Sequence, residues 1–253
     1  LKISTGHEKS KFGIPIEQLE QLKKIVSEHG IVIKTLHIHT GSDIKDADVF
    51  VSGIRVLSDL VHHFPDLQVI DLGGGFKVPY EPGGEETDIR SIAQKLQAFM
   101  DMHLAGKKYQ LWFEPGKYLV SESGYLVTEV NVIKNSGSVV FAGVNSGLNH
   151  LIRPMFYDAY HHIENISNPA GEEKIYTVTG YICETDTFAA DRKLHEVREG
   201  DYLVFYNAGA YGFEMSSNYN SRYKPAEVLF KNDRPVLIRR RDTWEDLLRN
   251  QVQ

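Results

Sequence analysis

The sequence predicts an α/β unit followed by a β-rich domain, with the change near residue 124. Before that point, strand-like apolar runs alternate with amphipathic helices at intervals of roughly 40 residues, the rhythm of a parallel sheet or of a (β/α) barrel. After it, short runs rich in Val, Tyr, Thr and Ile are separated by turn residues, which is typical of antiparallel strands. We therefore expect two domains, at residues 1–124 and 125–253.

In the first domain the pattern indicates three helices and three strands. They are a helix from Pro15 to Gly30, a strand over 31–40, a helix over 49–61, a strand over 69–72, a helix over 87–104 and a strand over 109–113. A closed (β/α)₈ barrel needs eight strands, so three βα units are either half of a barrel or a smaller open sheet.

The second domain is expected to be built from short strands. They fall at residues 125–133, 138–144, 175–182, 202–206, 226–230 and 235–240, and a capped helix is predicted from Thr243.

The bulk properties exclude several classes of protein. The hydrophobic fraction of 42 % and charged fraction of 25 % in 253 residues are ordinary for a soluble protein, and the net charge of −6 argues against nucleic acid as a partner. No run approaches the ~18 apolar residues of a membrane span. The single cysteine, Cys183, rules out an intrachain disulfide framework and fits a reducing cytoplasm. Because the chain opens at Leu1 without methionine, we expect a fragment or a processed chain.

Chemically useful groups follow the three predicted strands of the first domain. The first strand ends at His39 and Ser42, the second at the glycines 73–75, and the third at Glu114 and Gly116. Carboxyl ends of parallel strands meet at one edge of a sheet, where glycine amides and a hydroxyl make a phosphate site. An imidazole and a carboxylate beside it suit a flat heteroaromatic ring with a protonated nitrogen, as in pyridoxal 5′-phosphate.

Simpler interpretations remain open for each group. The glycines can form a turn without a ligand, and Glu114 can simply end a strand. His37 and His39 have a metal-ligand spacing that 161–162 could supplement, or they are ordinary core histidines. Cys183 can be a small buried hydrophobe.

The second domain also holds polar groups in apolar or turn settings. Arg153 lies in a largely apolar segment, Cys183 precedes Glu184, and Tyr211 lies between glycines. A buried arginine usually needs a carboxylate, from the protein or from a ligand. Structural salt bridges explain each group separately, but not readily all of them together with a phosphate site.

Six segments together resemble the diaminopimelate decarboxylases, which are alanine-racemase-like (fold-type III) pyridoxal-phosphate enzymes. The segments are HIHTGS, DLGGGF, EPGKYLV, LNHLIRPMFYDAYH, GYICETDTFA and NAGAYGFEMSSNYNSRYKPAEVL. They occur in the family's order and cover essentially the whole chain. The resemblance implies the C-terminal part of a TIM-like (β/α)₈ barrel followed by an antiparallel β-barrel or sandwich. It also implies a homodimer whose active sites are shared across the interface.

The resemblance further implies a role for particular residues. The implied cofactor contacts are His39 stacked on the ring, Ser42, Gly75 and Gly116 at the phosphate, Glu114 on the pyridine nitrogen, and also Gly74, Lys117 and Tyr211. The implied substrate contacts are Arg153 and Tyr157 on a carboxylate, Glu184 on the distal ammonium, and Lys117 and Tyr211. Cys183 would be the proton donor and, with His39, a catalytic residue; no metal is implied. The implied reaction converts meso-diaminopimelate to L-lysine and CO₂.

Several positions depart from the family pattern. Lys117 replaces a usual arginine, Asn145 and Asn207 replace frequent aspartates, and residues 184–187 replace a usual ESGD. No segment resembles the family's Tyr-Ala-Val-Lys-Ala-Asn setting of the Schiff-base lysine, so we expect this chain alone to be inactive.

Two alternatives stay open beside this reading. One is a decarboxylase of another basic amino acid or of a carboxylated polyamine. The other is a non-catalytic homologue that binds a partner. A metal-dependent hydrolase is the most remote reading.

Overall fold

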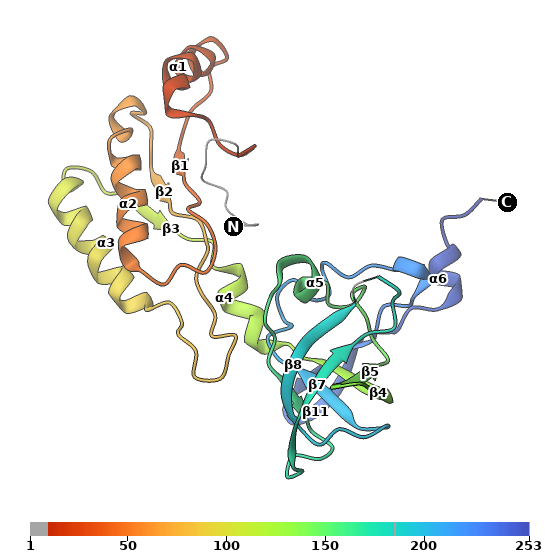
Figure 1. The fold of residues 1–253 in the computed structure, drawn as a ribbon. Coiled ribbons are helices and arrows are strands. Elements are labelled where there is room, and N and C mark those ends of the chain that lie inside the picture. The colour runs from red at the N-terminus through yellow and green to blue at the C-terminus, as the bar shows by residue number, and fades with distance from the viewer. Residues whose placement is uncertain (1–9, 185, 253) are drawn as a thin grey trace. The chain divides into compact units, whose positions relative to one another are not determined.

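The computed structural model describes residues 10–184 and 186–252, which form two compact units (Figure 1). The α/β unit comprises Leu1–Pro79 and Gly83–Leu119, and the β unit comprises Tyr80–Pro82 and Val120–Gln253. Along the chain the α/β unit thus gives way to the β unit between Leu119 and Val120, within the short helix α4 (Gly116–Val120).

The α/β unit is built on a parallel three-stranded sheet. Its strands are β1 (Thr35–His37), β2 (Val69–Asp71) and β3 (Gln110–Trp112), in the order β1-β2-β3. The register aligns Leu36, Ile70 and Leu111, which contribute to one core with the apolar faces of α2 (Ala47–Ser58) and α3 (Ile89–His103). The parallel arrangement confirms the βα rhythm of the sequence.

Capping residues set the helix boundaries. Asp46 accepts a hydrogen bond from the N–H of Asp48 at the start of α2, and Asp88 accepts from Arg90 and Ser91 at the start of α3. Such caps satisfy N–H groups that have no partner inside the helix. A 3₁₀ turn, η2 (Val61–His63), follows α2.

The first predicted helix begins as a 3₁₀ turn, η1 (Ile16–Gln18), and continues as α1 (Leu19–Glu28). Gly30, at φ +61°, follows its end, as a C-cap glycine does. The apolar face of α1 stays open, since no residue of the helix is buried. The strand predicted over 31–40 shrinks to β1, because the β2 ladder beside it ends where Gly73 turns to φ +67°.

The β unit contains a six-stranded sheet in the order β6-β9-β4-β5-β7-β8. The strands are β4 (Leu126–Ser136), β5 (Val139–Val144), β6 (Ile163–Asn165), β7 (Glu173–Thr179), β8 (Thr187–His195) and β9 (Tyr202–Phe205). Their inner faces form a second core around Val130, Leu203 and Phe205. The purely antiparallel domain predicted from sequence is wrong in one respect, because β5 and β7 pair in parallel.

Two strands were missed by the sequence pattern. β6 has three residues, too few to show an alternation, and β8 is interrupted at Asp191, which adopts φ +48° beside a register shift. A bulge of this kind breaks the period-2 pattern on which strand prediction depends.

A separate hairpin and a short helix complete the unit. β10 (Glu227–Lys231) pairs with β11 (Arg234–Arg239), and α6 (Trp244–Leu248) begins at Thr243 with a capping box to Asp246. A 3₁₀ turn, η4 (Tyr219–Ser221), precedes them, and η3 (Ser121–Ser123) follows α4.

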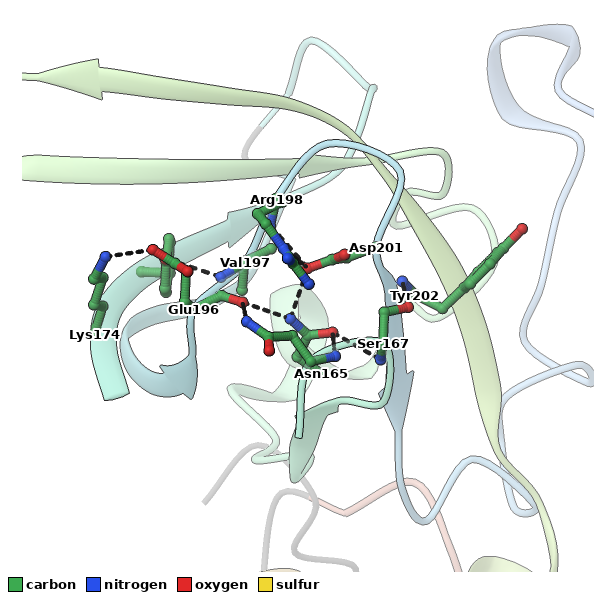
Figure 2. Close-up of polar contacts among 10 residues, drawn as sticks. Asn165, Ser167, Lys174, Glu196, Val197, Arg198, Asp201 and Tyr202 are labelled. Carbon is green, nitrogen blue, oxygen red and sulfur yellow. Dashed lines mark hydrogen bonds and ion pairs between the residues drawn. The ribbon is translucent and has the colours of Figure 1, made fainter. Parts of the chain in front are cut away.

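Buried polar contacts tie the end of β6 to the segment between β8 and β9 (Figure 2). Asn165 is 2 % exposed, and its Nδ2 donates to the carbonyl oxygen of Glu196 and to Oδ2 of Asp201. Its Oδ1 accepts from the N–H groups of Ser167 and Asn168. Because every polar atom of this amide is satisfied, its burial fixes the connection that leads into β9.

None of the helices in the described ranges has the length and hydropathy needed to cross a membrane.

Candidate functional site

Three strand ends of the α/β unit meet at the glycine triplet. A Cβ atom on Gly74 would lie 2.3 Å from the carbonyl oxygen of Glu114, and one on Gly75 would lie 2.1 Å from that of Gly41. A Cβ atom on Gly73 would lie 2.8 Å from Nδ1 of His39. The triplet is therefore required by backbone packing alone, since any side chain would force the three strand ends apart.

The amide groups of the triplet differ in what they can still bind. Gly73 donates to Oδ1 of Asp71 at 2.9 Å, and Gly74 donates to Nδ1 of His39 at 3.2 Å. Among the residues that the structure describes, the N–H of Gly75 donates to no acceptor. Of the two glycines of the triplet predicted to bind the cofactor, Gly75, the one expected at the phosphate, is thus the one with an available donor.

The hydrogen bond from Gly74 also determines which ring nitrogen of His39 carries the proton. Since Nδ1 accepts a hydrogen bond, the proton of the neutral ring lies on Nε2. The half-buried imidazole is held at the carboxyl end of β1. Its orientation therefore depends on the glycine turn beside it.

His37, Asp71 and Glu114 form a second cluster in the α/β unit. Nε2 of His37 lies 3.5 Å from Oε2 of Glu114, and one ligand atom from each of the three residues falls within 4.8 Å of the others. The His37–His39 spacing did suggest a metal pair, but in the structure it is His37 alone that joins the two carboxylates. The cluster has the donor types of a cation site.

The remaining predicted contacts of this unit lie outside its strands, Ser42 on the loop after β1 and Gly116 and Lys117 in α4. Ser42 is exposed, and the N–H of Gly116 donates to the carbonyl oxygen of Glu114 at 2.8 Å. Lys117, whose side chain is 12 % exposed, places Nζ 2.5 Å from Oδ1 of Asp43. The ammonium of Lys117 thus has a protein carboxylate beside it.

The α/β unit contains a cavity of about 740 Å³. His37, His39 and Glu114 supply its polar wall, and apolar side chains of residues 12–22, β1 and α2 line the rest. A mostly apolar cavity with a few convergent polar groups is typical of small-molecule sites.

In the β unit, Arg153 begins α5 (Arg153–Tyr157) and is 7 % exposed. Its Nη1 lies 3.0 Å from Nε2 of His161, its Nη2 donates to the hydroxyl of Tyr80 at 3.0 Å, and its Nε has no hydrogen-bond partner. No described residue forms an ion pair with this guanidinium. A buried arginine without a counter-charge is costly unless a ligand supplies one.

Tyr157 lies one helical turn from Arg153 in α5 and is half-buried. Side chains at i and i+4 share a helix face, so the two predicted carboxylate contacts have a common direction.

The loop at residues 180–186 carries the predicted proton donor. Cys183 is exposed, and the carboxylate of Glu184 accepts a hydrogen bond from the hydroxyl of Tyr219, which lowers the pKa of Glu184 and raises that of Tyr219. Cys183 is thus not the buried small hydrophobe that was the simpler interpretation.

Hydrogen bonds to the carboxylate of Asp186 hold this loop in place. Its Oδ2 accepts from the N–H of Ile182 at 2.8 Å and its Oδ1 from that of Leu148 at 2.7 Å. A Cβ atom on Gly180 would lie 2.2 Å from Oδ2 of Asp186. Burial raises the pKa of Asp186 although both N–H groups favour its charged form.

Tyr211 adopts φ +59° while its side chain is 48 % exposed. Asn207 earlier in the same loop is at φ +58°, a conformation that asparagine tolerates better than tyrosine. A Cβ atom on Gly209 would lie 1.9 Å from the carbonyl oxygen of Val120. The loop is thus tightly packed at Gly209, and Tyr211 is in a backbone conformation that is unfavourable for a bulky residue and is found more often at functional sites.

Comparisons with known proteins show which proteins this chain is similar to. Residues 1–121 match the pyridoxal-binding domain of pyridoxal-dependent decarboxylases. The diaminopimelate decarboxylase of Methanothermobacter thermautotrophicus is 41 % identical over 98 % of this chain and 60 % of its own length. The Escherichia coli enzyme is 38 % identical over 98 % of this chain and 62 % of its own length. This chain is a homologue of the diaminopimelate decarboxylases.

Solved structures agree with the sequence relatives. A crystal structure of diaminopimelate decarboxylase aligns with a TM-score of 0.91 at 37 % identity, covering 97 % of this chain and 62 % of that one. The Helicobacter pylori enzyme, solved with L-lysine, aligns with a TM-score of 0.86 at 32 % identity, over 98 % of this chain and 62 % of that one. The chain thus spans about 60 % of the length of the diaminopimelate decarboxylases that it matches.

The predicted site residues divide between the two units. His39, Gly74, Gly75 and Glu114 come together at one edge of the parallel sheet, with Ser42 on a loop and Gly116 and Lys117 at the start of α4 in the same unit. The β unit holds Arg153, Tyr157, Cys183, Glu184 and Tyr211. Their roles toward cofactor and substrate remain predictions.

Sequence reasoning missed three residues of this diaminopimelate decarboxylase homologue. His161 was considered only as a metal ligand, yet both ring nitrogens are engaged by Arg153 and by the carbonyl oxygen of Tyr206. Tyr80, near the glycine triplet in sequence, belongs to the β unit and contacts Arg153. Asp186 was considered only as part of residues 184–187, which replace a usual ESGD. Such contacts between residues distant in sequence leave no local pattern.

Proposed function

We propose that this chain acts in the pyridoxal-phosphate-dependent decarboxylation of meso-diaminopimelate to L-lysine and CO₂. The observation that carries the proposal is Arg153, a buried guanidinium with no carboxylate among the described residues. A substrate with a carboxylate away from the reacting carbon would supply the missing charge. The homology to diaminopimelate decarboxylases supports that substrate class.

The residues of the α/β unit fit the cofactor. The available N–H of Gly75, the Ser42 hydroxyl and Gly116 at the start of α4 would hold the phosphate, with Gly74 keeping the turn closed. The imidazole of His39, oriented by Gly74, would stack on the ring, and the exposed Glu114 carboxylate would bind the pyridine nitrogen. When bound, pyridoxal phosphate supplies an electron sink for the electron pair left by departing CO₂.

Residues of the β unit would bind the substrate and move a proton. Arg153 and Tyr157 would hold the remote carboxylate, and Glu184 the distal ammonium, because its depressed pKa keeps it charged. Cys183, whose side chain is exposed, would deliver a proton to the carbon that loses CO₂. Lys117 and Tyr211 would contact both the cofactor and the substrate.

The proposal includes the finer architecture. Residues 1–124 would be part of a TIM-like barrel that binds the cofactor, and residues 125–253 a β domain for substrate and dimer contacts. A cytoplasmic homodimer, in which Cys183 and Glu184 serve the partner's site, fits the exposure of both side chains.

The test uses the protein that contains this chain and measures CO₂ released from meso-diaminopimelate. Cys183→Ala should lower kcat by about 100-fold or more while the absorbance of bound cofactor is unchanged. Met102→Ala, at a helix position 76 % exposed, is the matched control and should leave kcat unchanged. Unchanged turnover in Cys183→Ala would remove that residue from the mechanism.

The substrate assignment is tested in the same assay with L-lysine, L-ornithine and L-arginine as competing substrates. A higher kcat/KM for one of these would move the function to another basic amino acid. Cofactor binding without turnover of any of them would indicate a non-catalytic homologue.

A further inference from the structure

The guanidinium of Arg153 is held by neutral groups, which is unusual for a buried arginine. Nη1 lies 3.0 Å from Nε2 of His161, and Nη2 donates to the hydroxyl of Tyr80, whose ring centroid lies 5.0 Å from the guanidinium carbon. Arginine has only donors, so Nε2 of His161 must accept and cannot carry a proton.

The other ring nitrogen of His161 is fixed by the backbone. Nδ1 lies 2.8 Å from the carbonyl oxygen of Tyr206, which can only accept, so Nδ1 carries the proton. His161 is 1 % exposed, and a peptide carbonyl and a guanidinium thus determine a single neutral tautomer.

Burial and nearby positive charges keep the imidazole of His161 neutral. Burial, together with the positive charges of Arg153 and Arg192, lowers the pKa of His161 to about 4. Arg192 also donates from Nη1 to the carbonyl oxygen of His161 at 2.8 Å. The imidazole therefore remains an acceptor at neutral pH.

A neutral hydrogen-bond acceptor beside Arg153 has a different effect on the guanidinium from a carboxylate. A carboxylate at this position would orient the guanidinium but would also cancel its charge, leaving little attraction for an anionic ligand. An imidazole and a phenol orient Arg153 and leave its charge uncompensated.

We propose that His161 is a positioning residue that holds Arg153 by a neutral hydrogen bond, so that a ligand carboxylate becomes the counter-charge of the guanidinium. The identity of that ligand as substrate rests on the proposed function. The positioning role itself requires only that carboxylates bind at Arg153.

Three substitutions of His161 distinguish the effect of its charge from the effect of its hydrogen bond to Arg153. His161→Gln retains a neutral acceptor, His161→Leu removes the acceptor, and His161→Glu retains an acceptor but adds a negative charge. A merely structural role predicts that His161→Glu is tolerated, since it can form an ion pair with Arg153. The proposed role predicts that it weakens carboxylate binding although the protein stays folded, which circular dichroism checks.

Binding is measured by calorimetry with L-lysine and with 1,5-diaminopentane, which has no carboxylate. His161→Glu and His161→Leu should weaken L-lysine binding about 10–100-fold and 1,5-diaminopentane binding less than about 3-fold. His161→Gln should stay within about 3-fold of the wild type for both ligands. Equal weakening for the two ligands, or wild-type binding of L-lysine by His161→Glu, would overturn the proposal.

Nitrogen-15 NMR gives a readout that does not depend on turnover. At pH 7 we expect the Nδ1-protonated neutral tautomer of His161, and a shift of the Arg153 Nε resonance on addition of glutarate or L-lysine. A charged or Nε2-protonated ring, or an Arg153 resonance that no carboxylate moves, refutes the positioning role. Carboxylate binding at Arg153 without CO₂ release would instead refute the proposed function and leave the role of His161 standing.

Discussion

The backbone of Gly75 packs against the carbonyl group of Gly41 so closely that a Cβ atom would come within 2.1 Å of its oxygen. Gly75 also adopts φ +89°, and its own carbonyl oxygen accepts a hydrogen bond from the N–H of Ile44 at 2.8 Å. The loop after β1 and the loop after β2 are therefore joined backbone to backbone. This leaves the remaining N–H of Gly75 in a fixed place at the edge of the sheet.

We predict that Gly75→Ala destabilises the α/β unit by on the order of 3 kcal/mol, because both the φ angle and the contact are unfavourable for alanine. Urea unfolding measures the change in the free energy of unfolding. Gly106→Ala is the matched control, since nothing lies within 4 Å of its added Cβ and its φ is not in the left-handed region. Equal effects of the two substitutions would contradict the contact.

Asp186→Asn should loosen the loop that carries Cys183. The side-chain amide has one acceptor oxygen in place of two, so the N–H of Ile182 or of Leu148 loses its partner, at a cost of roughly 1–3 kcal/mol. Hydrogen exchange at these two amides should become faster. Asp233→Asn, on an exposed turn at φ +59°, should change neither exchange nor stability.

Tyr211 offers a test of backbone strain. At φ +59°, Tyr211→Gly should be more stable than Tyr211→Ala by about 1 kcal/mol, because only glycine adopts this region without penalty. At the exposed helical position Met102 the order should reverse, with glycine about 1 kcal/mol less stable than alanine. The same order at both positions would show that Tyr211 is not strained.

Local patterns were sufficient for much of this structure. The alternation of strands and helices anticipated the parallel sheet, because parallel strands need a crossover between them, and the Thr243 cap anticipated α6, because a cap acts within a few residues. The glycine triplet was correctly singled out, but the close contacts with Gly41 and Glu114 that require it are visible only in three dimensions.

Contacts between residues far apart in the sequence could not be predicted from local patterns. The parallel pairing of β5 with β7, which are separated by α5 and β6, has no signature in either strand. In the same way, the pairing of Arg153 with His161 and Tyr80 depends on where three segments pack, so the arginine could be suspected from its apolar surroundings while its neutral partners could not.

The buried neutral His161 should make stability depend on pH. Its folded pKa, about 4, lies below the ~6.5 of an unfolded histidine, so the unfolded chain takes up the proton first on acidification. The groups facing the ring are Arg153, Tyr80, Arg192 and the Tyr206 carbonyl; the two arginines oppose protonation and the carbonyl favours it. The contribution to stability is therefore complete above pH ~6.5 and is lost as the pH falls toward 4, by on the order of 3 kcal/mol.

Urea unfolding at pH 7.5 and pH 4.5 measures this loss, and His161→Gln isolates it, because glutamine accepts from Arg153 without titrating. His150, whose pKa is also lowered by burial, contributes in the same direction and is present in both proteins, so its effect cancels in the comparison. We expect the free energy of unfolding to fall between the two pH values by about 2–3 kcal/mol more in the wild type than in His161→Gln. Equal falls would mean that the pKa of His161 is the same in the folded and unfolded chain, so that neither burial nor Arg153 holds its ring neutral in the folded protein.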